Sequence, residues 1–248
     1  MCDLRSLTPC VRPNPVLSMK PTNYKALVIG ASGTIGAAFS EILHSDPACS
    51  ALTELSRTSD PEFDFKMPEQ LESVASRLLE HGPWDLVIDA TGALTLEGQG
   101  PEKTLNALKA ETLIRAMEVN AVGPILLMKA LKAGLSKGPC WYAKLSARVG
   151  SIEDNHLGGW YGYRAAKAAL NQYLKTAAIE LHRTHPQLCV VAMQPGTVRS
   201  PLSAPFIRDE SHLTPAKESA QGLLDTLWTL APGQDAHFID YRGGRIPW

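Results

Sequence analysis

Short apolar runs alternate along this chain with segments whose apolar residues recur at helical spacing. The runs predict strands near 24–29, 52–56, 85–90, 140–146, 188–193 and 236–240. The periodic segments predict helices near 34–45, 68–81, 104–135, 163–184 and 215–230. Because strands that alternate with helices favour parallel pairing and right-handed crossovers, the pattern predicts one doubly wound, Rossmann-type α/β sheet. The site of such a fold lies at the carboxyl ends of the strands, where the strand order reverses.

Residues 1–22 stand outside this pattern. They contain three prolines before residue 20 and show no periodicity, so we expect a disordered tail ahead of a single domain at 23–248. Met19 lies just before the first strand and is a candidate initiator. The alternative is a short targeting or regulatory arm.

Composition narrows the class of protein. The chain has 248 residues, of which 44% are hydrophobic, and a net charge of −1, which argues against a general nucleic-acid surface. No apolar run reaches the ~18 residues of a membrane helix. The five cysteines have neither C-x-x-C nor metal-ligand spacing, so we expect reduced thiols, a cytoplasmic location and no metal site.

A glycine-rich turn, GASGTIG at 30–36, follows the first predicted strand and opens the first predicted helix. Gly30, Gly33 and Gly36 permit a tight turn and close approach of a phosphate. The free N–H groups of a helix start attract the same anion. This order of strand, turn and helix predicts a dinucleotide site, with Ser32 and Ile35 in the same turn.

Tyr163 and Lys167 stand four residues apart in YRAAK, at the start of an Ala/Leu-rich helical segment. Side chains at this spacing share a helix face, so we expect the ammonium to lower the pKa of the phenol and make Tyr163 a general acid or base. The alternative is a packed tyrosine beside a lysine that reaches to solvent.

Taken in order, these motifs and four others resemble the short-chain dehydrogenase/reductase family over about residues 24–248. The others are DATG at 89–92, where the family usually has N-N-A-G, VNAVGP at 119–124, LSARVGS at 145–151 and QPGTVRS at 194–200. The segments 150–172 and 195–206 and the terminal IPW resemble the C-factor branch of that family.

The resemblance implies an oxidoreductase that transfers hydride between NADP(H) and a small carbonyl or alcohol substrate. It assigns proton transfer to Tyr163, activation and ribose binding to Lys167, orientation of the substrate oxygen to Ser146, and a relay water to Asn120. The residues expected to bind the cofactor are Gly30, Ser32, Gly33, Ile35, Gly36, Ser56, Arg57, Asp64, Ala90, Thr91, Gly92, Asn120, Tyr163, Lys167, Pro195, Gly196, Thr197 and Val198.

The choice of NADP(H) over NAD(H) depends on the end of the second predicted strand. An acidic residue there favours the 2′-hydroxyl of NAD, whereas an arginine favours the 2′-phosphate of NADP. Arg57 follows Ser56 at this position, and no acid stands directly at the strand end. Arg57 as an ordinary surface charge is the alternative. Asp64 resembles the aspartate that contacts the adenine.

Substrate contacts are expected on the loops at 93–103, 150–160 and 200–214. The stretch from Pro201 to Thr214 resembles the family's mobile substrate lid. Ser146 and Tyr163 are 17 residues apart, more than is usual in the family. The extra residues are expected to form a loop by the substrate site, which makes His156 and Trp160 candidate substrate contacts. The alternative is that they only pack within the loop. The helices at 104–135 and 163–184 resemble the family's dimer interface, so we expect a homodimer or homotetramer. Two other functions stay open: a C-factor-like signalling protein with little turnover, and lipid hydrolysis at Ser146, which lacks a G-x-S-x-G elbow.

Overall fold

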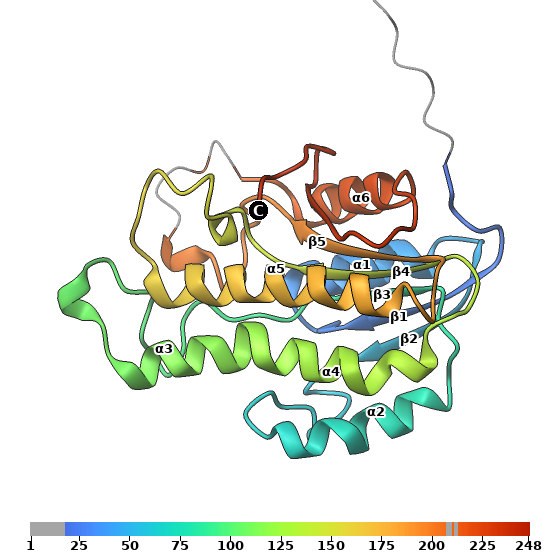
Figure 1. The fold of residues 1–248 in the computed structure, drawn as a ribbon, viewed down its shortest axis with the longest axis horizontal. Helices are drawn as coiled ribbons and strands as arrows, with labels where there is room; N and C mark the ends of the chain where they lie inside the picture. Colours follow the sequence, from blue (N-terminus) through green and yellow to red (C-terminus); the bar gives the residue numbers. More distant parts are fainter. Residues whose placement is uncertain (1–17, 207–209, 211–212) are drawn as a thin grey trace, which may run out of the picture.

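The computed structural model describes residues 18–206, 210 and 213–248. Most of the tail expected at 1–22, and part of the lid expected at 201–214, therefore lie outside the described residues. Six parallel strands form one sheet in the order β2-β1-β3-β4-β5-β6 (Figure 1). The strands are β1 (Tyr24–Ile29), β2 (Cys49–Leu55), β3 (Leu86–Asp89), β4 (Cys140–Leu145), β5 (Leu188–Gln194) and β6 (His237–Asp240).

Helices cover both faces of the sheet (Figure 1). One face carries α2 (Leu71–Leu79), α3 (Ala110–Met117), α4 (Gly123–Leu131) and α5 (Tyr161–Leu181); the other carries α1 (Thr34–His44) and α6 (Ala216–Leu227). Short 3₁₀ turns lie at Pro68–Gln70, Leu105–Ala107, Lys132–Gly134, Arg148–Gly150 and Ala204–Phe206. The doubly wound, Rossmann-type sheet predicted from the sequence is confirmed. The strand order reverses between β1 and β3, so the cofactor turn and DATG meet at this point.

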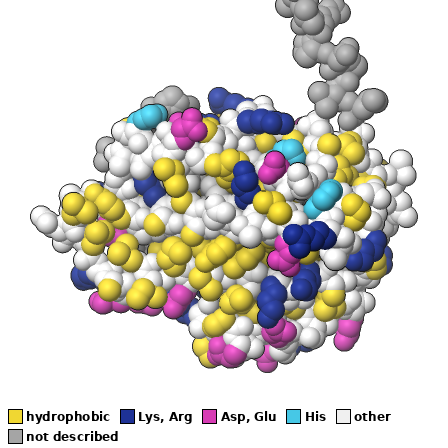
Figure 2. All heavy atoms as spheres, in the orientation of Figure 1, with side chains coloured by type: hydrophobic (Ala, Val, Ile, Leu, Met, Phe, Trp, Pro, Cys, Tyr) yellow, Lys and Arg dark blue, Asp and Glu magenta, His cyan; other side chains and the backbone are white. Residues whose placement is uncertain are grey.

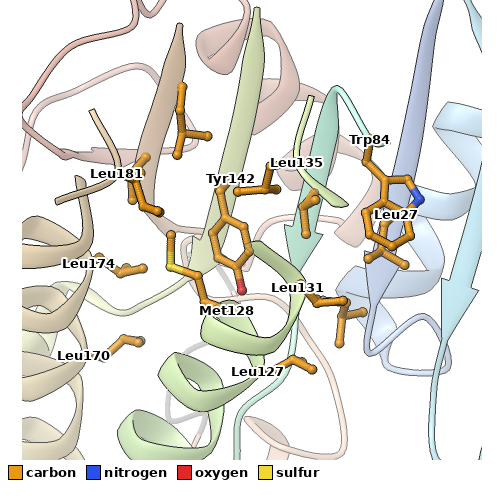
Figure 3. Packing of buried hydrophobic residues seen from close by; sticks show 14 of the residues in the cluster. Leu27, Trp84, Leu127, Met128, Leu131, Leu135, Tyr142, Leu170, Leu174 and Leu181 are labelled. Atoms are coloured by element: carbon orange, nitrogen blue, oxygen red, sulfur yellow. The ribbon is translucent and has the colours of Figure 1, made fainter. Parts of the chain in front are cut away.

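The hydrophobic core has two layers, one on each side of the sheet. Leu127 and Met128 of α4 and Leu170 and Leu174 of α5 pack against Tyr142 of β4 (Figure 3). On the opposite face, α1 and α6 cover the alternate residues of the same strands. Because β4 is buried on both sides, its side chains are almost all apolar, as is usual for a central parallel strand.

The segment expected as one helix at 104–135 is divided in the structure. Helices α3 and α4 are joined by a π-helical segment at Glu118–Val122. Pro124 accounts for the interruption, since its ring has no N–H to donate and would clash with the carbonyl of residue i−4, which is Asn120. Sites of this kind often carry function, and the expected relay residue lies in this one.

Within the described residues, no helix is long and apolar enough to cross a membrane.

Candidate active site

The glycine-rich turn between β1 and α1 is shaped by the absence of side chains. Gly30 has a positive φ of 80°, and a Cβ at Gly36 would lie 2.1 Å from the Gly30 carbonyl oxygen. Gly33 donates its N–H to that same oxygen at 2.9 Å and precedes α1 without a side-chain cap. The first N–H groups of α1 therefore remain available to an anion, and Ser32 is exposed beside them. This geometry fits a dinucleotide pyrophosphate.

The end of β2 lies beside this turn, because Gly30 donates its N–H to the Leu55 carbonyl at 2.7 Å. The Ser56 hydroxyl is occupied locally, accepting from the Ser59 N–H at 3.1 Å. Arg57 is exposed, and no described carboxylate pairs with it. The nearby Asp60 is held by Arg77 at 2.6 Å. The residue that follows Ser56 is thus an exposed cation, and the nearest acid beyond it, Asp60, is already paired.

Further along the chain, Asp64 lies half-buried before Phe65, whose ring packs so closely on Gly123 that a Cβ there would lie 2.4 Å from it. The contact places Asp64 beside α4. Ile35, also half-buried, packs against the core layer of α1 and α6.

The DATG turn after β3 brings three elements together. Ala90 donates to the Ile29 carbonyl of β1 at 2.8 Å. A Cβ at Gly92 would lie 3.3 Å from Asn120 Oδ1 and 3.4 Å from Lys167 Nζ. The structure therefore joins three of the residues expected at the site, Gly92, Asn120 and Lys167, around one short backbone turn.

Tyr163 and Lys167 lie on the first turns of α5. The Lys167 ammonium donates to the Leu145 carbonyl at 3.0 Å and lies 5.7 Å from the centre of the Tyr163 ring. The expected lowering of the Tyr163 pKa is wrong for this geometry: burial raises the pKa of the phenol. Burial also holds the pKa of Lys167 well below its usual value, and the positive charge of Lys144 lowers it further, against the opposing effect of Asp89.

Asn120 is fully buried in the π-helical segment. Its Oδ1 accepts from the Ala93 N–H, and its Nδ2 donates to the Ala93 carbonyl, both at 2.9 Å. Nδ2 also donates to the Ala116 carbonyl at 3.2 Å. Both ends of the amide are therefore engaged in holding the backbone after DATG, which fixes Asn120 beside Lys167.

Ser146 lies elsewhere than expected. Its side chain is 4% exposed and donates to Asn171 Oδ1 at 2.6 Å. Asn171 is eight residues beyond Tyr163 on α5, which is about 12 Å along the helix axis. The hydroxyl therefore points into the packed interface of β4 and α5 and not to a substrate oxygen at Tyr163. The next residue, Ala147, has no hydroxyl to take that role.

A cavity of about 430 Å³ opens beside Tyr163. Its wall consists mainly of the loop after DATG, including Leu94, Gln99 and Glu102, and is completed by Phe206. Phe206 belongs to the segment expected as a lid. A largely apolar wall with few polar groups suits a small organic molecule.

The two candidate substrate contacts on the loop before α5, Trp160 and His156, lie in different places. The Trp160 ring contacts both Tyr163 and Phe206 edge to face, with centroids 6.2 and 5.5 Å apart. His156, by contrast, is exposed and does not line the cavity. Of the two candidates on this loop, only Trp160 lies at the site.

Sequence reasoning missed Glu102. Its carboxylate accepts from the Gly162 N–H at 2.9 Å, and its carbonyl accepts from the Trp160 N–H. An acid at a helix start is favoured by the helix dipole, but here it comes from a loop sixty residues away, so no local pattern reveals it.

The turn after β5 closes the site. Gly196 has φ of 75°, and a Cβ there would lie 2.7 Å from the Tyr241 ring. The Pro195 carbonyl accepts from the Ser219 hydroxyl at 2.6 Å, and the Thr197 carbonyl accepts from the Thr214 N–H at 2.9 Å. Val198, the next residue, is buried.

Fold and site together define a doubly wound α/β protein with a dinucleotide turn and a tyrosine–lysine pair beside a small-molecule cavity. The family model for short chain dehydrogenases matches residues 24–211. The chain belongs to the short-chain dehydrogenase family.

Several known proteins are similar to this chain. The 1-hydroxy-2-glutathionyl-2-methyl-3-butene dehydrogenase of Rhodococcus sp. (strain AD45) is 29% identical over 234 residues, covering 90% of this chain and 98% of its own. The C-signal of Myxococcus xanthus is 30% identical over 169 residues, 67% of this chain and 94% of its own, in agreement with the resemblance to the C-factor branch.

Solved structures agree on the fold. A Burkholderia multivorans protein described as a short-chain dehydrogenase/reductase with bound NADP has a TM-score of 0.74 and 26% identity, covering 92% of this chain and 100% of its own. The carbonyl reductase Sniffer of D. melanogaster has a TM-score of 0.77 at 19% identity, with coverage of 92% and 100%.

Proposed function

We propose that this protein is an NADP(H)-dependent oxidoreductase that interconverts a small carbonyl compound and its alcohol at Tyr163. One observation carries the proposal: Lys167 and Asn120 both lie against Gly92. Tyr163, on the same helix as Lys167, lines the adjacent cavity. A tyrosine positioned at a small-molecule cavity, with a buried ammonium on its own helix face, suits proton exchange with a substrate oxygen.

The residues at the switch point fit the cofactor. The N–H groups at the start of α1 would hold the pyrophosphate, Arg57 the 2′-phosphate, and Lys167 the nicotinamide ribose. The turn from Pro195 to Val198 would line the nicotinamide pocket. When bound, NADP(H) supplies hydride in reduction and accepts it in oxidation.

Tyr163 exchanges the proton that accompanies the hydride. A phenol with an ordinary pKa of about 10 is already protonated at neutral pH. Burial raises the pKa of Tyr163 further, so Tyr163 acts as the acid in reduction. As its proton passes to the substrate oxygen, the forming phenolate is stabilised by the Lys167 ammonium on the same helix face. Asn120 keeps the backbone beside Lys167 in place during this transfer.

Three observations support NADP(H) over NAD(H). Arg57 is exposed at the end of β2, Asp60 is already held by Arg77, and the similar Burkholderia protein was solved with NADP. The C-signal relative keeps open a signalling role with little turnover. Lipid hydrolysis at Ser146 is opposed by the burial of that hydroxyl against Asn171.

The test is NADPH and NADH titration by fluorescence, followed by a panel of aldehydes and ketones with Tyr163→Phe. We expect turnover to fall by about 10²–10⁴-fold, because the proposed proton donor is removed, while the dissociation constant for NADPH stays unchanged. Tyr161→Phe is the matched control, since Tyr161 is exposed on the same helix turn. Near-normal reduction by Tyr163→Phe would refute the mechanism, and NADPH binding without turnover on any carbonyl would favour the signalling role.

A further inference from the structure

A lysine is completely buried in the central strand of the sheet. Lys144 lies in β4 with 1% of its side chain exposed, and its ammonium is 3.0 Å from Oδ1 of Asp89, which is 0% exposed. A buried charge is costly unless it is both paired and hydrogen-bonded. An apolar pair of similar volume would often be as stable or more stable, so core stability does not explain this pair.

All partners of the Lys144 ammonium belong to the DATG turn. It donates to the Thr91 carbonyl at 2.6 Å and to the Thr91 hydroxyl at 2.9 Å, in addition to Asp89. Asp89 Oδ1 in turn accepts from the Thr91 N–H at 2.9 Å. Asp89 Oδ2 has no hydrogen-bond partner within the described part of the chain. The charge of this carboxylate is therefore balanced by the Lys144 ammonium at its other oxygen, Oδ1. Strand β4 is thereby fastened to the turn that ends β3.

The DATG turn that Lys144 holds also contacts the residues of the candidate active site. Gly92 follows Thr91 directly, and a Cβ at Gly92 would lie within 3.4 Å of both Lys167 Nζ and Asn120 Oδ1. A displacement of Thr91 would therefore move the backbone against which Lys167 and Asn120 are placed. Small displacements of this kind, even away from the reacting atoms, can reduce rates by about 10²-fold.

The same lysine affects the charge around Lys167. The charged and titratable groups that act on Lys167 are Tyr163 from its own helix, Lys144 from β4 and Asp89 from β3. Lys144 acts on Lys167 more strongly than Asp89 does and in the opposite direction.

We infer that Lys144 is a positioning residue of the active site, which with Asp89 fixes the DATG turn against Lys167 and Asn120. The inference rests on the proposed function. It gives a reason for two unusual residues of this chain. Lys144 is a lysine within an otherwise apolar strand, and Asp89 stands where the family usually has the first asparagine of N-N-A-G.

The experiment compares wild type, Asp89→Asn, and the double variant Lys144→Met with Asp89→Asn. The double variant removes both charges and leaves neither unpaired, so it is expected to fold. Without the fastened turn, its dissociation constant for NADPH should rise about tenfold and kcat/KM should fall by about 10²-fold. Fluorescence titration measures the first without needing turnover.

The pH profile of kcat separates positioning from simple packing. In Asp89→Asn, Lys144 loses the carboxylate that raises its pKa, while burial still lowers that pKa, so Lys144 loses its charge. The double variant has no Lys144 charge either. In both variants the positive charge that lowers the pKa of Lys167 is gone, so the alkaline limb moves to higher pH. A shift to higher pH in both variants supports the inference.

A matched control removes the exposed pair of Lys129 and Glu72, 2.8 Å apart, by Lys129→Met with Glu72→Gln; every readout should stay at the wild-type value. A folded double variant with wild-type NADPH affinity, kcat/KM and pH profile overturns the inference and leaves the proposed function standing. A wild-type protein that fails to bind NADPH overturns both. Should the double variant fail to fold, an unmoved pH profile in Asp89→Asn overturns the inference.

Discussion

The Ser146 hydroxyl is engaged two helical turns away from Tyr163, and this placement has a measurable consequence. In Ser146→Ala, Asn171 Oδ1 would lose its donor inside the core, and a buried polar atom left without a partner costs about 1–3 kcal/mol. We expect the free energy of unfolding to fall by that amount in denaturant titrations, with kcat within a fewfold of wild type. Asn171→Ala, which removes the other partner, should have a similar effect. A large loss of kcat at unchanged stability would show that Ser146 reaches the substrate.

Arg57 is the residue on which the choice of cofactor depends. In Arg57→Ala the proposed charged hydrogen bond to the 2′-phosphate, worth roughly 1.5–3 kcal/mol, would be lost, so NADPH binding should weaken about tenfold or more. NADH affinity should not change, because NADH has no such phosphate. Both dissociation constants are measured by fluorescence titration. Equal affinity for the two cofactors in the wild type would contradict the assignment.

Motifs indicated Tyr163, Lys167, Asn120 and the glycines, which the structure brings together at the switch point, but they did not predict side-chain direction. Ser146 ends a strand, where a shift of one residue turns a side chain to the opposite face. Lys144 could have been found from the sequence, because a lysine within an apolar strand requires a buried partner. The pKa of Tyr163 depended on burial, which spacing alone does not reveal.

At the scale of elements, the turn from β1 into α1 allows the least change. Gly36→Ala would place a Cβ 2.1 Å from the Gly30 backbone oxygen, so the turn would have to open. We expect a loss of about 1–3 kcal/mol in thermal or denaturant unfolding, as for other overpacked sites, and NADPH binding weakened at least tenfold. Gly138→Ala is the control, since its Cβ would meet nothing nearer than 3.7 Å. Wild-type NADPH affinity in Gly36→Ala would contradict this account of the turn.

The six strands were all predicted near their observed places. The central strands β1, β3, β4 and β5 are buried and read as apolar runs, whereas β2 is largely exposed. The long helix at 104–135 was predicted without its interruption. Pro124 lies near the start of α4, a position where proline is usually tolerated. Because α3 continues directly into α4, however, a residue four positions earlier is also helical, and the π-helical segment relieves its clash with the proline ring.

At the scale of the whole molecule, we predict self-association through α3 and α5. These helices lie side by side, and a band of hydrophobic side chains crosses the face that they form with α4 (Figure 2). Ile114 on α3 is 59% exposed and Ile179 on α5 is 46% exposed. Large apolar side chains gathered on one face mark an interaction site, here for a second copy of this chain.

Sedimentation velocity at micromolar concentration should show a dimer or tetramer, and Ile114→Glu should shift it toward monomer. Ile152→Glu is the control, because Ile152 is 78% exposed but lies on the loop after β4. A wild-type protein that sediments only as a monomer would refute the prediction.

The strand order also determines the sequence in which the molecule can be built during synthesis. Strands β1 and β2 come first in the chain and pair with each other, and β3 pairs with the other edge of β1. From β3 onward each new strand joins the same growing edge in chain order. The ends of β1 and β3, which would receive the nucleotide, are therefore adjacent before the ribosome has delivered Tyr163. We expect nascent chains to form the nucleotide half before the catalytic half, with the backbone N–H and C=O groups at the edge of β3 unpaired until β4 arrives.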